Sequence, residues 1–276
     1  MTPVDARSAA RSDGRSIAYD VAGDRATGAP LVVLHAVGLN RGIWSDWAGP
    51  LVDAGHYVIA VDLPGHGDSD PEPAAPSLSG MAAGVVAVLD AEGLATAAIL
   101  GVSMGGMVAQ TLAIEWPART QALVLCCTMA TVPDSVRPLL RRRGADAVEG
   151  GMAAVVAPTL ERWLSPEGRE SGVSERIAQA LLADDATIFN GCWDAISQLD
   201  TVVGLAGVSV PTLVIAGGSD TSLPPNSGET LAAAVPGSTL IVIPGAWHLG
   251  AYEQPGPFLA HTREFLAPYS GLSVID

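Results

Sequence analysis

The strongest candidate for chemistry is a serine set among glycines near the middle of the chain. Ser103 is the centre of the pentapeptide "GVSMG" (101–105), which follows an apolar run and precedes a stretch with helical patterning. A sharp strand-to-helix turn strains the central backbone, and glycines on both sides leave room for the neighbouring chain. The hydroxyl then projects above the sheet, where the helix amino terminus favours developing negative charge. The pentapeptide alone is a weak signal, but its position between a strand and a helix strengthens it, and we predict that Ser103 is a nucleophile rather than part of a cramped turn.

A serine hydroxyl needs a base to attack a carbonyl, and the base needs an acid to orient it. The histidines of the chain are His35, His56, His66, His248 and His261. His248 lies between the last apolar run and the terminal helix, and we predict that it is the base. Asp220, in "GGSD", is predicted to be the acid because it directly follows a late strand. Asp62 also ends a strand, but much earlier in the chain.

Acyl transfer also requires N–H donors that stabilise the oxyanion. One should be the backbone N–H of Met104, directly after the nucleophile. The other should come from the loop "HAVGLN" (35–40), where we place it on Val37. His35 is expected to brace that loop rather than to transfer protons, and His66 is expected to be structural. His261 falls within the terminal helix, where a packing or surface role is expected.

The apolar runs of the chain are continuous rather than alternating, which is typical of parallel strands buried on both faces. They are "PLVVLH" (30–35), "YVIAVD" (57–62), "AAILG" (97–101), "ALVLCC" (122–127), "PTLVIAG" (211–217) and "TLIVIP" (239–244). A further strand or hairpin is expected around "RSIAYDVAG" (15–23). Helical stretches at 78–92 and 105–116 separate some of these runs. Alternating strands and helices predict a doubly wound α/β sheet.

This alternation stops between residues 130 and 205, where three helix-like stretches occur without a convincing strand. A helical insertion after a central strand would lie over the carboxyl ends of the strands, where open α/β sheets bind ligands. We therefore expect a core of residues 1–129 and 206–276 and a helical lid of residues 130–205. The alternative is a group of extra helices packed on the flank.

Composition excludes several classes of protein. Hydrophobic residues make up 49% of the chain, no apolar run reaches a membrane span, and the polar amino terminus lacks a secretory signal pattern. The net charge of −15, with arginine as the only basic residue type, argues against nucleic acid and anionic membranes as partners. Three cysteines without metal-ligand spacing indicate a reduced compartment, so we expect a cytoplasmic protein without a metal or cofactor. The oligomeric state is left open.

The chain resembles the α/β-hydrolase superfamily over about residues 15 to 268, on the motifs "HAVGLN", "DLPGHGDS", "GVSMGG", "GGSD" and "WHL". The resemblance implies the α/β-hydrolase fold, a mostly parallel sheet flanked by helices with a helical lid after the sixth strand. It also implies the chain order nucleophile, acid, base. Within the superfamily the chain is most similar to 3-oxoadipate enol-lactonases, through "GVSMGGMVAQTLA", "GGMAAVVAPTLERWLSP", "NGCWDAI" and "HLGAYEQPGPF", whereas "HAVGLN" is nearer to small esterases.

The substrate pocket is expected under the lid. A substrate carboxylate would require an arginine there, because guanidinium pairs with carboxylate in a bidentate way. The arginines available are Arg137, Arg141, Arg142, Arg143 and Arg162, of which Arg162 is the preferred candidate. The other residues expected to line the pocket are His35, Met129, Trp163, Trp193 and Trp247. Each of these side chains could instead belong to a helix surface or to the core between lid and sheet.

These features predict a cofactor-free serine hydrolase that cleaves a small-molecule ester or lactone through an acyl-enzyme on Ser103. The same residues could also support perhydrolysis or carbon–carbon bond hydrolysis, because related folds use one triad for all three reactions. A third reading is a ligand receptor, in which the triad is retained and a partner protein recognises the position of the lid.

Overall fold

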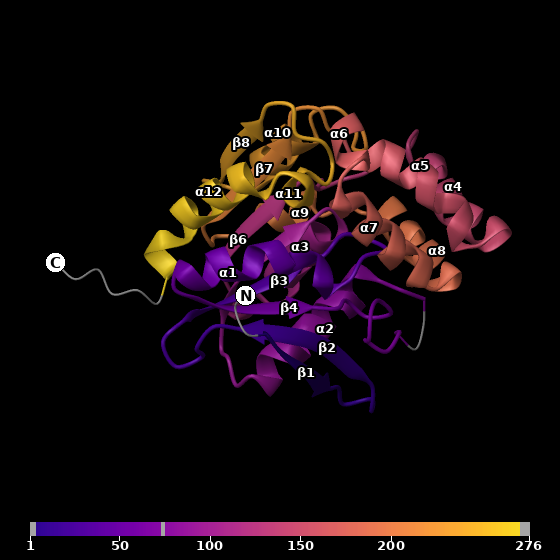
Figure 1. Cartoon of the computed structure of the whole chain (residues 1–276). Coiled ribbons are helices and arrows are strands. Elements are labelled where there is room, and N and C mark those ends of the chain that lie inside the picture. The colour runs from indigo at the N-terminus through magenta and orange to yellow at the C-terminus, as the bar shows by residue number, and fades with distance from the viewer. Residues whose placement is uncertain (1–3, 73–74, 271–276) are drawn as a thin grey trace.

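The computed structural model describes residues 4–72 and 75–270. Its central feature is an eight-stranded sheet with the strand order β1-β2-β4-β3-β5-β6-β7-β8 (Figure 1). The strands are β1 (Val4–Ala10), β2 (Ser16–Ala22), β3 (Ala29–Leu34), β4 (His56–Val61), β5 (Ala97–Val102), β6 (Thr120–Cys126), β7 (Thr212–Gly217) and β8 (Thr239–Ile243). All neighbouring pairs from β4 to β8 are parallel, which confirms the mostly parallel sheet.

The central strands are buried along their whole length. Every residue of β4 and β5 is buried, and the register places Val32 opposite both Ile59 and Ile99. Continuous Val, Ile and Leu runs suit such positions because helices cover both faces of a parallel sheet. The apolar runs in the sequence therefore correspond to the buried parallel strands, and the loops that follow them lie at the carboxyl edge of the sheet.

The amino-terminal hairpin is larger than the sequence indicates. Strand β2 matches the expected segment, and β1 pairs with it in antiparallel register from Val4↔Ala22 to Ala10↔Ser16. Strand β1 lies at the sheet edge with only Ala9 buried, so its sequence is polar and carries no apolar run. Arg7 on this strand pairs with buried Glu92, which fastens the hairpin to the core.

The core helices lie on both sides of the sheet. They are α1 (Ser45–Asp53), α2 (Leu78–Ala91), α3 (Met104–Glu115), α10 (Ser227–Ala234), α11 (Gly250–Glu253) and α12 (Pro255–Leu266). From β3 the chain first moves to β4, on the side of the sheet that leads to β1. It then returns past β3 to β5 and continues to β6, on the side that leads to β8. Because such crossovers are right-handed, α1 lies on the face opposite to α2 and α3. Helix α1 packs against α12, and α2 packs against α3.

Helices fill the segment between β6 and β7. They are α4 (Arg137–Gly150), α5 (Met152–Trp163), α6 (Pro166–Arg169), α7 (Gly172–Ala183), α8 (Ala186–Ser197) and α9 (Val202–Leu205). Helix α4 packs against α8 and α5 against α7, and Figure 1 shows these four helices gathered on one side of the molecule. The segment contributes no strand to the sheet, and its only bridge among the described residues joins Thr131 to Asp200.

The strand order reverses direction between β3 and β5. Loops leaving the carboxyl ends of two such strands diverge, and the crevice between them is where open α/β sheets bind ligands. The loop after β3 and the turn after β5 are the two segments that carry the predicted oxyanion donors and nucleophile.

None of the helices in the described ranges has the length and apolar character needed to cross a bilayer.

Candidate active site

Ser103 occupies the turn between β5 and α3 with backbone angles φ 54° and ψ −117°. Positive φ is strained for a residue with a side chain, so the surrounding structure must impose it. The Ser103 N–H donates to the carbonyl of Cys126 (3.0 Å), and its carbonyl accepts from the Thr128 hydroxyl (2.8 Å). Both partners lie at the end of β6, so the neighbouring strand fixes this turn.

Two glycines make the turn possible. A Cβ atom on Gly101 would lie 2.3 Å from the carbonyl carbon of Gly105. A Cβ atom on Gly105 would lie 2.3 Å from the carbonyl oxygen of Leu34, in β3. Backbone atoms cannot give way by that much, so the expected need for small residues at both positions is confirmed by the packing.

The structure brings Ser103, His248 and Asp220 together at this turn, although His248 is 145 residues from Ser103 and 28 residues from Asp220 in the chain. The His248 Nε2 atom lies 2.9 Å from Ser103 Oγ, and its Nδ1 atom lies 2.8 Å from Asp220 Oδ2. Because ionised Asp220 only accepts, we assign the proton to Nδ1, which leaves Nε2 to accept from the serine hydroxyl. Ser103 is 5% exposed and His248 is 2% exposed, so the hydrogen bonds are shielded from water.

Asp220 is held by two groups. Its Oδ1 atom accepts a hydrogen bond from the backbone N–H of Ser222 (2.8 Å), while Oδ2 contacts His248. The buried thiol of Cys127 lies in the same region, and burial together with the charge of Asp220 raises the pKa of Cys127 well above its usual value. This cysteine therefore stays protonated at neutral pH and is no competing thiolate nucleophile.

The two predicted oxyanion donors are available. Val37 lies in the loop after β3, and Met104 is the first residue of α3; both are buried. Neither backbone N–H donates to an acceptor within the described ranges. A buried N–H without a partner is costly, so unpaired donors beside a candidate nucleophile indicate a site for an external acceptor.

His35 braces the loop that carries Val37. Its Nδ1 atom is 2.8 Å from the Ala36 carbonyl, and its Nε2 atom accepts from the Leu63 N–H (3.0 Å). Burial, with a smaller contribution from neighbouring His66, lowers the pKa of His35 to about 3, so the ring is neutral at physiological pH. Both ring nitrogens are engaged by backbone groups, which leaves none to contact a substrate.

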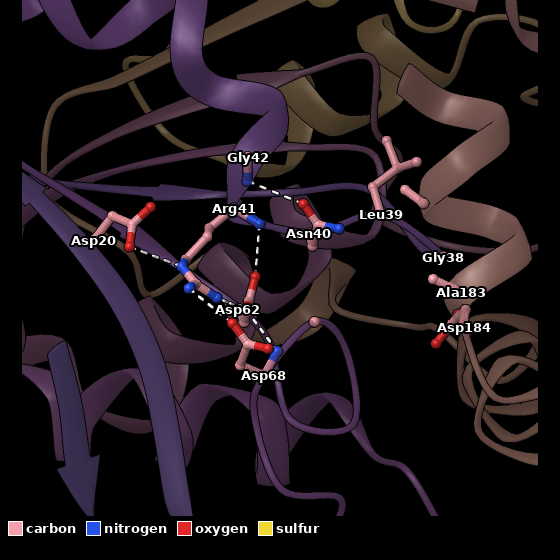
Figure 2. Close-up of a pocket in the computed structure, with 12 residues that line it drawn as sticks. Asp20, Gly38, Leu39, Asn40, Arg41, Gly42, Asp62, Asp68, Ala183 and Asp184 are labelled. Carbon is pink, nitrogen blue, oxygen red and sulfur yellow. Dashed lines mark hydrogen bonds and ion pairs between the residues drawn. The ribbon is translucent and has the colours of Figure 1, made fainter. Parts of the chain in front are cut away.

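Arg41 fixes the other end of the same loop, beside a cavity of about 360 Å³ (Figure 2). Its side chain binds Asp20 Oδ1 (2.9 Å), Asp68 Oδ2 (2.8 Å) and Asp62, and its backbone N–H donates to Asp62 Oδ1 (2.6 Å). Asp62 is fully buried. From the sequence Asp62 stands out only as an early strand-ending acid and Arg41 not at all, because Asp20 on β2 and the loop after β4 that carries Asp62 and Asp68 are far from Arg41 in the chain.

Replacing Arg41 with methionine should lower the free energy of unfolding by about 3–5 kcal/mol, because buried Asp62 would lose its counter-charge. Urea denaturation followed by circular dichroism measures this difference. Arg176 provides a control, since it forms an exposed ion pair with Asp46 at 2.7 Å, and its replacement should cost at most about 1 kcal/mol. Equal effects of the two substitutions would contradict the bracing role of Arg41.

The expected pocket residues occupy different places. Trp163 on α5 is buried with its ring 5.9 Å from that of His248, and Trp193 on α8 packs edge-on against Phe189 at 6.1 Å. Met129 is buried and its carbonyl accepts from Gln110 (3.1 Å), while Trp247 is half-buried. The structure thus places Trp163 beside the candidate base, whereas the Met129 contact belongs to the core.

The arginines of the insertion divide into paired and unpaired side chains. Arg137, Arg141 and Arg142 are held by Asp134, Ser197 and Glu149 respectively. Arg162 is half-buried and lines a cavity of about 350 Å³ between α4 and α5, together with Arg143. The guanidinium carbon of Arg143 lies 5.0 Å from the centre of the Trp193 ring.

The described residues contain no group of three or more His, Cys, Asp or Glu side chains that could hold a metal ion.

The sheet order and the placement of the site define the class of protein. The family model of the alpha/beta hydrolase fold matches residues 29–255, and the chain belongs to this family. It is 28% identical over 230 residues to 3-oxoadipate enol-lactonase 2 of Acinetobacter baylyi, covering 83% of this chain and 85% of that protein. It is 31% identical over 244 residues to a pimeloyl-[acyl-carrier protein] methyl ester esterase of Neisseria meningitidis, covering 86% and 90%.

Solved structures agree with this assignment. The enol-lactonase from Burkholderia xenovorans LB400 superimposes with a TM-score of 0.88 at 26% sequence identity, covering 94% of this chain and 99% of that one. The family membership and the resemblance to enol-lactonases and small esterases predicted from the sequence are therefore confirmed.

Proposed function

We propose that the protein is a serine hydrolase that cleaves a small-molecule ester or lactone through an acyl-enzyme on Ser103. The observation that carries the proposal is the hydrogen-bonded series from Ser103 Oγ to His248 Nε2 (2.9 Å) and from His248 Nδ1 to Asp220 Oδ2 (2.8 Å). Together with the strained turn that presents the serine, this series supports nucleophilic rather than purely structural use of the site.

In the proposed reaction, His248 accepts the Ser103 proton through Nε2 as the serine oxygen attacks the substrate carbonyl carbon. The N–H groups of Val37 and Met104 stabilise the oxyanion. His248 then delivers the proton to the leaving oxygen as the carbonyl–oxygen bond breaks. It next takes a proton from the water that attacks the acyl-enzyme, and it returns that proton to Ser103 Oγ as the acid leaves. Asp220 keeps the imidazole oriented and stabilises its charged form in both halves of the reaction.

The relatives support an ester or lactone as the substrate class. One is an enol-lactonase and another a methyl ester esterase, and both match more than four-fifths of this chain. Both names describe cleavage of an acyl–oxygen bond, which supports the reaction proposed for the Ser103 site.

We also propose that residues 130–205 form the cap of the site, over a core of residues 1–129 and 206–276. The ring of Trp163 on α5 lies 5.9 Å from the ring of His248, and the Leu249 N–H donates to the Trp163 carbonyl (3.1 Å). On α8, Phe189 reaches the loop after β3, since a Cβ on Gly38 would lie 2.9 Å from its ring. Two cap helices thus contact the loops around Ser103.

The free buried thiols fit a reducing cytoplasm as the place of action.

The proposal is tested with a panel of short-chain 4-nitrophenyl esters and five- and six-membered lactones. We expect wild-type protein to release acid from at least one class without added metal or cofactor, detected by pH-stat titration. Turnover that persists undiminished in folded Ser103→Ala protein would overturn the proposal, as would no turnover of any ester or lactone.

A further inference from the structure

The end of helix α5 is hydrogen-bonded to the segment that directly follows His248. The Leu249 N–H donates to the Trp163 carbonyl (3.1 Å), and the Ser165 N–H donates to Glu253 Oε2 (3.0 Å). The Ser165 hydroxyl donates to the other carboxylate oxygen, Oε1. The proposed cap is therefore joined to the core at residues that lie one and five positions after the candidate base.

The Glu253 carboxylate is packed against the proposed cap as well as hydrogen-bonded to it. Both of its oxygens accept from Ser165, which is 7% exposed. The Ser165 hydroxyl oxygen also accepts from the Gly168 N–H (2.9 Å), so the same side chain caps helix α6. A Cβ atom on Gly168 would overlap the carboxyl carbon of Glu253. These contacts hold the carboxylate and the end of α5 in one relative position.

On the core side, Glu253 is the last residue of α11, the single helical turn after His248. The Gly250 N–H donates to the Trp247 carbonyl (2.9 Å), and the Glu253 N–H donates to the Leu249 carbonyl (3.0 Å). The turn is thus a short link between the Glu253 side chain and the two residues that flank His248. An anchor at Glu253 therefore restricts the backbone from which the imidazole projects.

On the cap side, the same attachment sets the place of Trp163. The indole is fully buried, and its ring centre lies 5.9 Å from that of His248 at an interplanar angle of 42°. A side chain packed there limits rotation of the imidazole away from Ser103 and keeps water from it. An aromatic ring at this distance also attracts the imidazolium that forms when Ser103 gives up its proton.

A second contact between the insertion and the core shows what distinguishes this one. Arg176 on α7 binds Asp46 on α1 at 2.7 Å, but the two side chains are 40% and 50% exposed. Water and salt screen such a pair, so it contributes little to the position of the helix. The Ser165–Glu253 contact is more buried and reaches the base segment, so it can transmit the position of α5 to His248.

We propose that Glu253 is a positioning residue of the reaction, which through Ser165 holds the end of α5, and with it Trp163, against His248. This inference rests on the proposed function, in which His248 is the base. Because the Glu253 carboxylate binds Ser165, it acts on the base only through the packing of the cap. Loss of this contact should slow the chemical step and leave substrate binding nearly unchanged.

The test compares Glu253→Gln with Asp46→Asn, which removes the other carboxylate between the insertion and the core. The amide keeps the size of the side chain, but its NH₂ group cannot accept from the Ser165 N–H. We expect Glu253→Gln to slow labelling of Ser103 by an alkyl fluorophosphonate about 10-fold. Asp46→Asn should change the rate less than about twofold. For a hydrolysed ester, Glu253→Gln should lower kcat and leave KM within about twofold of the wild type.

Two further substitutions examine how Glu253 acts. Trp163→Leu should itself slow labelling, and adding Glu253→Gln to it should slow labelling little further, because both changes release the same contact with His248. Ser165→Ala removes the hydroxyl from the other side of the contact and should slow labelling as well. Ser165→Thr keeps the hydroxyl and should retain most of the wild-type rate.

The His248 Nδ1 proton, followed as a downfield resonance in the proton NMR spectrum, separates this proposal from the proposed function because it requires no turnover. We expect this proton to exchange with water faster in Glu253→Gln and Ser165→Ala than in the wild type, with thermal melting to show that each protein is folded. Wild-type exchange and labelling rates in both folded variants would overturn the proposal, as would multiplicative losses with Trp163→Leu. Wild-type protein that is not labelled at Ser103 would count against the proposed function, and the exchange of the Nδ1 proton would still decide this one.

Discussion

Replacing Ser103 with alanine should lower kcat/KM for a hydrolysed ester by about 10⁴- to 10⁶-fold, and replacing His248 with alanine should have an effect of similar size. The reason is that the Ser103 oxygen and the His248 imidazole act as one unit. Without the imidazole the hydroxyl keeps its proton, and without the hydroxyl the imidazole has no nucleophile to activate. The double variant should therefore be scarcely slower than either single variant.

Steady-state kinetics on the two single variants and the double variant make this prediction quantitative. Thermal melting must show that each variant is folded, which we expect because removing the Ser103 hydroxyl releases only its bond to His248. Multiplicative losses, in which the double variant falls by the product of the two single effects, would show that the residues act independently. That outcome would contradict the proposed roles.

Replacing Gly105 with alanine should destabilise the protein by about 3 kcal/mol or more, although alanine is the better helix former. The new methyl group would lie 2.3 Å from the Leu34 carbonyl oxygen and 2.7 Å from that of His35. Both are backbone atoms at the end of β3, so the methyl would push α3 away from the sheet. The turn that holds Ser103 would be lost with it.

Gly256 provides a matched control for this substitution. Like Gly105 it is the second residue of its helix, but a Cβ atom on Gly256 would meet nothing within 4 Å. Gly256→Ala should be neutral or stabilise by up to about 1 kcal/mol. Urea denaturation distinguishes the two, and an equally small effect at both positions would contradict the close approach of α3 to β3.

The sequence pattern predicted those features whose causes are local. Gly101 reflects its close contact with Gly105, four residues further on, and the apolar runs reflect burial on both faces of the sheet. Asp220 and His248 could be chosen because each follows a late strand, and parallel strands end at the same edge. The structure places both side chains within hydrogen-bond distance of one another.

Features that depend on packing between distant segments were not predictable in the same way. Strand β1 is an exposed edge strand, so it carries no continuous apolar run. The pattern favoured Arg162 because it adjoins Trp163. The structure places Arg162 and Arg143 in the same cavity and stacks Arg143 on Trp193, fifty residues away in the chain on α8. Which arginine of α4 forms an ion pair depends on how α4 packs against α8. The spacing of residues along the sequence does not predict that packing.

Whether Ser103 is the nucleophile can be read directly from covalent labelling of the wild-type protein with an alkyl fluorophosphonate, followed by intact-mass and peptide analysis. We expect one equivalent of label on the peptide that contains Ser103. Labelling should disappear in Ser103→Ala and be strongly slowed in folded His248→Ala. Folded wild-type protein that remains unlabelled, or label that appears on another residue while Ser103 stays free, would contradict the assignment of Ser103 as the nucleophile.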